Sequence, residues 1–259
     1  MRRVVAHAFV GDLAEPALAD NDVHHFSRVL RLRPGEPVSV SDGRGGWRLC
    51  QWLGDALAPL AEPIWSPPPE PQLTVGFALT KGDHPEWAVQ KLTEAGADRV
   101  VIMVTDRCIA RWGPGQESRQ LDRLREIARQ SAMQSRRSWL PSVEGPVPFS
   151  VLVRGEDGQT GGGVALAVQG GAPLTLSTPT VLVGPEGGWS ESELASLPED
   201  RHVGLGRNVL RAETAALAAG VMLAALRDGL VLPARPSGVS RPAETERAGE
   251  QHPGEGNPG

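Results

Sequence analysis

The chain has 259 residues, enough for one large or two modest domains, and its 40% hydrophobic and 22% charged residues suit a globular protein. The formal net charge of -5 gives no overall signal of nucleic-acid binding. The two cysteines, Cys50 and Cys108, lie far apart and form no Cys-x-x-Cys motif, which argues against a disulfide framework and a cysteine-based zinc site. No secretion signal or long apolar span is visible, so we expect a cytoplasmic protein without membrane contact.

Residues 1–70 are predicted to form a small β-rich domain. A short helix at 24–30 precedes two strands, at 36–40 and 47–52, and the glycines between these strands are typical of a hairpin turn. The proline-rich run 67–71 then interrupts any ladder or helix, because proline lacks a backbone donor. This run is the predicted linker.

From residue 72 onward, strand-like and helix-like segments alternate. Strands are predicted at 73–79, 100–104, 164–168, 180–183 and 202–205. Helices are predicted at 83–95, 116–135, from 190 and at 213–227, with capping boxes formed by Asp83 with Glu86 and by Ser190 with Glu193. This alternation predicts a parallel sheet covered on both faces over residues 72–232. Residues 233–259 are rich in Pro, Gly, Ser, Glu and Arg, and are predicted to be a disordered tail.

Two glycine-rich turns are the most informative feature of the chain. The first is Gly184-Pro185-Glu186-Gly187-Gly188, and the second begins at Gly204-Leu205-Gly206. Each follows a short apolar run and leads into a helix. Loops at the carboxyl ends of parallel strands hold the ligands of open α/β sheets, and glycine allows a backbone to approach a ligand closely. We therefore expect the two loops to line the same pocket, although either could be an ordinary strand-to-helix turn.

Other motifs are absent from the sequence. Neither loop reads G-x-G-x-x-G, and no P-loop or G-x-S-x-G elbow occurs, which argues against dinucleotide, nucleoside-triphosphate and α/β-hydrolase sites. Adjacent His24 and His25 have no partner cluster, so we predict no metal site.

Arginine is concentrated in the segment 111–139. This segment holds three acids, Glu117, Asp122 and Glu126, against seven arginines: Arg111, Arg119, Arg123, Arg125, Arg129, Arg136 and Arg137. Such a helix is either a solvated face or a surface for phosphate groups.

The final helix is apolar on almost every side, from Thr214 to Leu226. A helix of this kind must be buried all round. One face can pack on the sheet, and the other requires either a second subunit or the middle of one large core.

Several short motifs, in order, resemble the RsmE-type family of bacterial small-subunit ribosomal RNA methyltransferases, within the SPOUT superfamily. The resemblance spans about residues 5–230. Its carriers are His25 with Arg28-Val29-Leu30-Arg31, Lys81-Gly82-Asp83 with Glu86-Trp87, Gln90-Lys91 with Thr93-Glu94 and Gly96, Gln134 with Arg137 and Pro141, the Val183–Gly188 loop, and Leu205-Gly206 with Val209-Leu210-Arg211 and Glu213-Thr214. Each is weak alone, but their order and spacing together are specific.

The resemblance implies the architecture and the activity. It implies an N-terminal PUA-like β-barrel for RNA and a C-terminal α/β SPOUT domain whose parallel sheet carries a deep trefoil knot. The implied reaction is S-adenosylmethionine-dependent methylation of N3 of a uridine in 16S ribosomal RNA of the small subunit, by a homodimer.

The resemblance also implies roles for particular residues. Uracil N3 must lose its proton, and a cation near the flanking carbonyl oxygens would stabilise the resulting charge, so Arg211 is the candidate catalytic donor and Glu213 a candidate base or orienting group. Arg211 could instead simply pair with Glu213 or Glu186. The expected cofactor-binding residues are Ala167, Val168, Val183, Gly184, Pro185, Glu186, Gly187, Gly188, Leu205, Gly206, Val209, Leu210 and Thr214. The expected RNA-binding residues are Arg28, Arg31, Arg33, Arg136 and Arg137.

The sequence departs from the family pattern at a few positions. Arg207-Asn208 stands where Pro-Arg is common, Ala212 where threonine is frequent, and Gln130-Ser131 and Met133 where the long helix usually carries other residues, among them glutamates. Two alternatives therefore stay open: an RNA-binding or assembly factor that has lost catalysis, and a SPOUT enzyme acting on another RNA or base atom.

Overall fold

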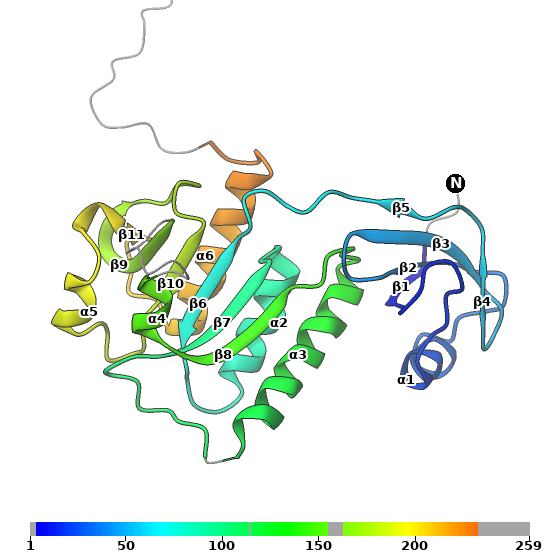
Figure 1. Ribbon diagram of the computed structural model, residues 1–259, viewed down its shortest axis with the longest axis horizontal. Helices are drawn as coiled ribbons and strands as arrows, with labels where there is room; N and C mark the ends of the chain where they lie inside the picture. The colour runs from blue at the N-terminus through cyan, green and yellow to red at the C-terminus, as the bar shows by residue number, and fades with distance from the viewer. Residues whose placement is uncertain (1–3, 114, 155–162, 233–259) are drawn as a thin grey trace, which may run out of the picture.

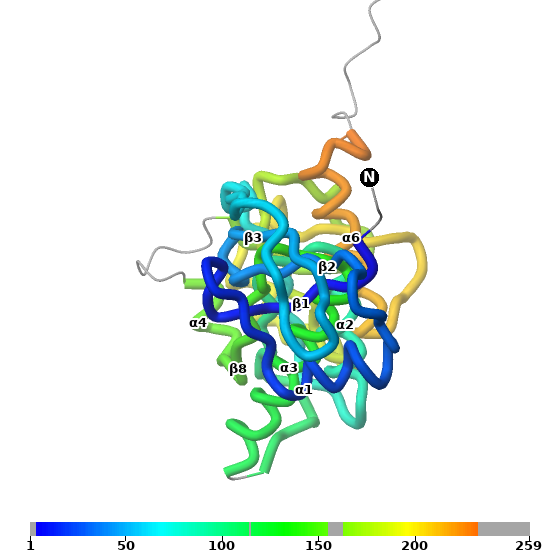
Figure 2. Tube along the Cα trace, turned by 90° about the vertical axis from the view of Figure 1, so that its right-hand side faces the viewer, coloured from blue at the N-terminus to red at the C-terminus, as the bar shows by residue number. Residues whose placement is uncertain are grey.

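The computed structural model describes residues 4–113, 115–154 and 163–232, so the predicted disordered tail at 233–259 lies outside the described residues. Two sheets lie side by side along the long axis of the molecule, and the segment after β5 (Ile64–Trp65) runs from the smaller sheet to the larger one (Figure 1). Seen from its narrow end, the smaller sheet lies in front of the larger one (Figure 2).

The small sheet contains β1 (Ala6–Phe9), β2 (Pro37–Ser41), β3 (Gly46–Trp52), β4 (Leu57–Pro59) and β5. β1 pairs with β2 in parallel, while β2 and β3 form the predicted antiparallel hairpin, and β4 and β5 both pair with β3. The predicted helix is a pair of short turns, α1 (Asp20–His24) and the π-helix η1 (His25–Val29). Phe26 of η1 is fully buried and meets Trp52 edge-on, at 5.6 Å between ring centroids.

The large sheet has six strands, all parallel, in the order β11-β9-β10-β6-β7-β8. Five match the predicted strands: β6 (Thr74–Ala78), β7 (Arg99–Val104), β9 (Val164–Pro173), β10 (Thr180–Val183) and β11 (His202–Gly204). The sixth, β8 (Ser142–Pro148), was not predicted because Gly145, Pro146 and Pro148 break its apolar pattern. Such residues are tolerated at the edge of a sheet, which is where β8 lies.

Helices cover both faces of the large sheet, as the alternation predicts. One face packs against α2 (His84–Ala95), α3 (Glu117–Gln134) and α6 (Ala212–Arg227) through a core that includes Val75 and Phe77. The opposite face carries α4 (Phe149–Arg154) and α5 (Glu191–Ala195), which pack against Ala78 and Leu182. A short 3-10 turn, η2 (Glu199–Arg201), precedes β11.

The two predicted capping boxes have different outcomes. The box at α5 is confirmed: the backbone N–H of Glu193 donates to the Ser190 hydroxyl, and the Glu193 carboxylate accepts from the Ser190 backbone N–H. The box at α2 is wrong, because the Asp83 side chain makes no capping hydrogen bond and Glu86 instead pairs with Arg123 of α3 at 2.9 Å.

Several contacts fix the small sheet to the rest of the chain. Met133 of α3 packs into the core of the small sheet, and Arg129 of α3 forms an ion pair with the buried carboxylate of Asp22. The turn between β2 and β3 reaches Trp139, and a β-carbon on Gly45 would lie 2.7 Å from its indole ring. Only glycine allows this close approach, so the hairpin turn is shaped by its contact with the α3–β8 connection.

A buried carboxylate joins the ends of three elements of the larger unit. Asp98, just before β7, accepts hydrogen bonds from the backbone N–H of Leu73 at 2.9 Å, from Arg137 at 3.0 Å and from Arg227. Both arginines also donate to backbone carbonyls next to Asp98, Arg137 to Ala97 and Arg227 to Gly96. The start of β6 and the C-terminal ends of α3 and α6 are thereby held at one point.

We expect Asp98→Ala to lower the free energy of unfolding by about 3–5 kcal/mol, because it leaves two buried guanidinium groups without their carboxylate. Urea unfolding followed by circular dichroism measures this loss. Glu144→Ala is the control, since it breaks the half-exposed Arg99–Glu144 pair, which is worth at most about 1 kcal/mol. Equal losses in the two variants would contradict the role given to Asp98.

Candidate functional site

A cavity of about 550 Å³ lies at the carboxyl ends of β10 and β11, beside the middle of β9. The loop after β10 and the loop after β11 form two of its walls, and Ala167–Gln169 of β9 with the start of α6 close it. The expectation that two glycine-rich loops line one pocket is therefore met. Its lining is largely apolar, with one acidic residue, Glu186, and one basic residue, Arg211.

Most of the residues predicted from the sequence to bind a cofactor meet in this cavity. Those that line it are Ala167, Val168, Val183, Gly184, Pro185, Glu186, Gly188, Leu205, Gly206, Val209 and Leu210. Gly188 has a φ of +68°, and a β-carbon there would meet no atom within 4 Å. A side chain at this position would be both strained and directed into open space.

Gly187 and Thr214 do not line the cavity. A β-carbon on Gly187 would lie 3.4 Å from Cβ of Arg107, and the Gly187 carbonyl accepts a hydrogen bond from the Arg107 guanidinium at 3.1 Å. Gly187 therefore faces the loop after β7, because the turn places successive residues on opposite sides. Thr214 is exposed on α6.

Sequence reasoning missed several lining residues: Gln169, Trp189, Leu194, Asn208, Ala212 and Ala215. Trp189 is the most informative of these. Its indole N–H donates to the carbonyl of Ala167 at 3.0 Å, and a β-carbon on Gly184 would lie 3.0 Å from its ring. The ring is buried beneath the first loop, and its position directly after the glycine pair is the signal that could have identified it.

The loop after β10 is fixed by hydrogen bonds to its neighbours. One carboxylate oxygen of the buried Glu193 accepts from the backbone N–H of Asp106 at 2.8 Å, and the other accepts from Ser190 at 2.8 Å. The Ser190 hydroxyl also donates to the Asp106 carboxylate at 2.6 Å. The loops after β7 and β10 are thus linked side by side.

Arg211 and Glu213 point to different surroundings. Arg211 is the residue directly before α6, and its backbone is extended. Its side chain is exposed and lines the cavity. Glu213 is largely buried, and its carboxylate lies 3.4 Å from Nδ1 of His84 at the start of α2. Within residues 4–232, as far as they are described, Arg211 pairs with neither Glu186 nor Glu213.

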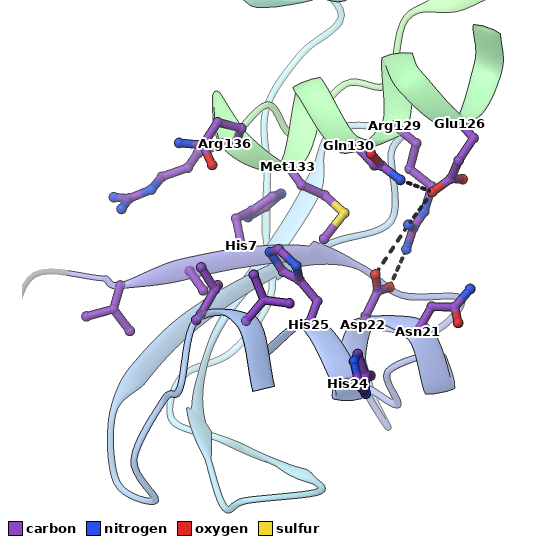
Figure 3. Close-up of a pocket in the computed structure, with 15 residues that line it drawn as sticks. His7, Asn21, Asp22, His24, His25, Glu126, Arg129, Gln130, Met133 and Arg136 are labelled. Carbon is purple, nitrogen blue, oxygen red and sulfur yellow. Dashed lines mark hydrogen bonds and ion pairs between the residues drawn. The ribbon is translucent and has the colours of Figure 1, made fainter. Parts of the chain in front are cut away.

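A second cavity, of about 650 Å³, lies between the small sheet and α3 (Figure 3). Arg136 lines it, while Arg28, Arg31 and Arg33 are exposed along and just after η1. Arg137, in contrast, is largely buried and forms an ion pair with Asp98, so its side chain does not face the surface where RNA was expected to bind. His24 and His25 are exposed at this cavity, and the described part of the chain holds no cluster of His, Cys, Asp or Glu suited to a metal ion.

No helix among the described residues has the length and apolar character needed to cross a membrane.

Comparison with known proteins identifies two matching family models. A model described as an RNA methyltransferase domain matches residues 67–224, and one described as an RNA methyltransferase PUA domain matches residues 18–51. The chain is 34% identical over 224 residues to a Mycobacterium bovis protein named Ribosomal RNA small subunit methyltransferase E, covering 80% of this chain and 86% of the relative. A Synechocystis protein of the same name is 32% identical over 230 residues, covering 82% and 74%.

A solved structure has the same fold. It is the structure of a Ribosomal RNA small subunit methyltransferase E from Neisseria gonorrhoeae bound to S-adenosyl methionine, with a TM-score of 0.71 and 24% identity. The match covers 86% of this chain and 98% of that one.

Proposed function

The chain belongs to the RNA methyltransferase family, and on that premise we propose that it transfers the methyl group of S-adenosylmethionine to N3 of a uridine in 16S ribosomal RNA. The observation that carries this proposal is the cavity in which the two glycine-rich loops meet Arg211. The curated relatives support ribosomal RNA of the small subunit as the substrate, since that is what their names state. Because this substrate is cytoplasmic, we propose the same location for the protein.

The cavity fits S-adenosylmethionine in size and chemistry. Its volume of about 550 Å³ falls in the range of small-molecule sites, and its walls combine apolar side chains with exposed backbone. Leu205, Val209 and Leu210 offer apolar contacts for an adenine ring, and the backbone of the two glycine-rich loops offers polar groups for the rest of the molecule. The N–H of Gly188 is not among these groups, because it donates to the Pro185 carbonyl at 2.8 Å. S-adenosylmethionine supplies a methyl group on a positively charged sulfur.

Arg211 would act on the acceptor base. During the reaction, N3 of uracil would lose its proton, and negative charge would spread to the flanking carbonyl oxygens. As N3 forms its bond to the methyl carbon, the bond between that carbon and the sulfonium sulfur would break and leave a neutral thioether. A guanidinium at these oxygens stabilises that charge more in the transition state than in the ground state. Glu213 faces His84 outside the cavity, so we propose that it positions the start of α6 and that the N3 proton passes to solvent.

We assign residues 1–70 to a PUA-like RNA-binding barrel and residues 72–232 to the SPOUT domain. The small sheet and the match to a PUA model support the first assignment. A deep trefoil knot in the second is compatible with the sheet order, in which the chain passes from β9 to β10 on one side and returns to β11 on the other. Arg28, Arg31, Arg33 and Arg136 are the proposed phosphate contacts.

A homodimer would cover the outer face of α6. Ala216, Ala219 and Leu223 are buried against the protein's own core, whereas Val221 is 48% exposed and Leu217, Ala218 and Ala225 are only partly buried. The predicted all-round burial of this helix is therefore incomplete in one copy. A second copy that packs on this apolar stripe would complete it.

Two alternatives differ from this proposal in measurable ways. A non-catalytic assembly factor would bind RNA without transferring a methyl group. A SPOUT enzyme for another target would transfer it to a different RNA or base atom. Mass spectrometry of 16S nucleosides from a deletion strain distinguishes all three, because only the proposed activity predicts specific loss of 3-methyluridine.

We expect Gly188→Leu to weaken S-adenosylmethionine binding by at least about tenfold, because the new side chain would fill the cavity. Calorimetry measures the affinity. Gly229→Leu is the matched control: Gly229 has the same φ of +68°, equally open surroundings and no part in the cavity. If the two folded variants bind with equal affinity, the cavity is not the cofactor site.

Arg211→Ala should lower the single-turnover rate of methyl transfer by about 100- to 1000-fold while changing cofactor affinity only a few-fold. The exposed Arg207, which does not line the cavity, provides the control variant Arg207→Ala. A collapse of affinity together with rate would make Arg211 a cofactor or structural residue, and loss of activity only in Arg207→Ala would move the role to that residue.

Val221→Arg should convert a dimer into monomers, because an unpaired charge is costly in an apolar interface. Val151→Arg on α4 is the control, since Val151 is a similarly exposed valine elsewhere. Leu223 is unsuitable for this test because it is fully buried within one copy. Light scattering at micromolar concentration gives the answer, and a monomeric wild-type protein would refute the proposed interface.

A further inference from the structure

The cavity between the small sheet and α3 has no part in the proposed methyl transfer. It shares no lining residue with the cavity at the carboxyl ends of β10 and β11. With about 650 Å³ it is large enough for a nucleotide. Figure 3 shows its walls: Met133 of α3 and Arg136, just after α3, lie on one side, and His7 and His25 of the small unit lie on the other.

The residues that line this cavity carry no net charge in total. They include two arginines, Arg129 and Arg136, and two acids, Asp22 and Glu126. Arg129 pairs with both acids, which leaves these three side chains with a net charge of -1, and Arg136 offsets that charge. His7 forms part of the floor, where it is buried and hydrogen-bonded to the hydroxyls of Ser39 and Ser41. Burial lowers the pKa of His7 to about 4, so this ring is neutral at physiological pH.

The rim, in contrast, carries arginines in an unusual backbone conformation. Among the described residues, the non-glycine positions with positive φ are Arg31, at +52°, and Arg136, at +56°. Each follows the end of a helical segment, Arg31 after η1 and Arg136 after α3. Helices commonly end with glycine in this left-handed conformation, and another residue costs about 1–2 kcal/mol.

Both arginines lie next to the same cavity. Arg136 lines the cavity, and Arg31 directly follows Leu30, which lines it from the small unit. Both are exposed. Glycine would suit both backbones better, so the arginine side chains have a use other than folding.

We propose that this cavity binds the base of an unpaired nucleotide of the RNA substrate, with the adjacent phosphates held by Arg31 and Arg136. The proposal rests on the proposed function in taking RNA as the substrate. The uncharged ring of His7 in the floor suits a neutral base, and the exposed guanidinium groups of Arg31 and Arg136 suit its phosphates. The exposed imidazole of His25 provides a surface for stacking, the accessible edge of Met133 provides an apolar contact, and the amide of Gln134 can bond a base edge.

This nucleotide is not the one that is methylated. The small sheet and the C-terminal end of α3 form its site, whereas the proposed cofactor cavity lies at the carboxyl ends of β10 and β11. An unpaired base held here would fix the register of the RNA on the protein. Proteins read single-stranded RNA in this way, by taking up splayed bases.

Fluorescence anisotropy with two RNA hairpins tests the proposal. The two probes have the same stem, and one carries a single unpaired nucleotide. Wild-type protein should prefer the hairpin with the unpaired nucleotide, and Arg136→Gly should reduce that affinity by about tenfold or more while the melting temperature stays equal or rises, because the strain is relieved. Arg119→Ala, at an exposed arginine near the other end of α3, should leave the preference intact.

A second measurement detects the base itself. The methyl resonance of Met133 should shift when the hairpin with the unpaired nucleotide is added, and should not shift with the fully paired one. His25→Ala should reduce the preference without changing the affinity for S-adenosylmethionine. Equal affinity of wild-type protein for both hairpins, or equal loss for both in Arg136→Gly, would overturn the proposal.

The outcome can be distinguished from failure of the proposed function. Methyl transfer without any preference for the unpaired nucleotide would overturn this inference alone. A preference without methyl transfer to 16S ribosomal RNA would overturn the proposed function and leave the nucleotide site in place.

Discussion

The carboxylate of Asp98 is the interaction on which the larger unit depends. It joins the start of β6 to the C-terminal ends of α3 and α6, three points widely separated along the chain. α6 is one continuous helix, so holding its C-terminal end also positions its N-terminal end. That end follows Arg211 and lies near the carboxyl ends of the strands. The geometry of the candidate site is therefore set in part by an ion-pair network at the far end of the same helix.

The helix α3 joins this framework to the small sheet. Its C-terminal end is held through Arg137, and one turn earlier Met133 enters the core of the small sheet. An apolar side chain fits here because the position is buried, and Arg129 supplies the polar contact through Asp22. One apolar side chain and one ion pair from neighbouring turns of α3 thus add to the contact that the β2–β3 turn makes with Trp139.

Much of this architecture could be predicted from the sequence. The parallel strands, the long helices and the family follow from apolar runs, glycine turns and motif order, and the structure and comparisons confirm them. The strand β8 could not be predicted, because its prolines and glycine are allowed only by its place at the edge of the sheet. The direction in which each residue faces could not be predicted from the sequence either. Gly187 and Gly188 are neighbours, yet only Gly188 lines the cavity. Arg137 is largely buried, whereas Arg136 directly before it is exposed. Glu213 pairs with His84, which lies in a distant segment of the chain, so no local sequence pattern predicts this pair.

The hydrogen bonds of Glu193 have a consequence for the entropy of ligand binding. A flexible loop loses conformational freedom when a ligand orders it, and that loss opposes binding. Here the loop after β10 is already tied, through one buried carboxylate, to its own short helix and to the loop after β7. Most of the ordering therefore takes place when the chain folds. A molecule that enters the cavity meets a wall already in shape, and its contact energy is available for affinity and orientation.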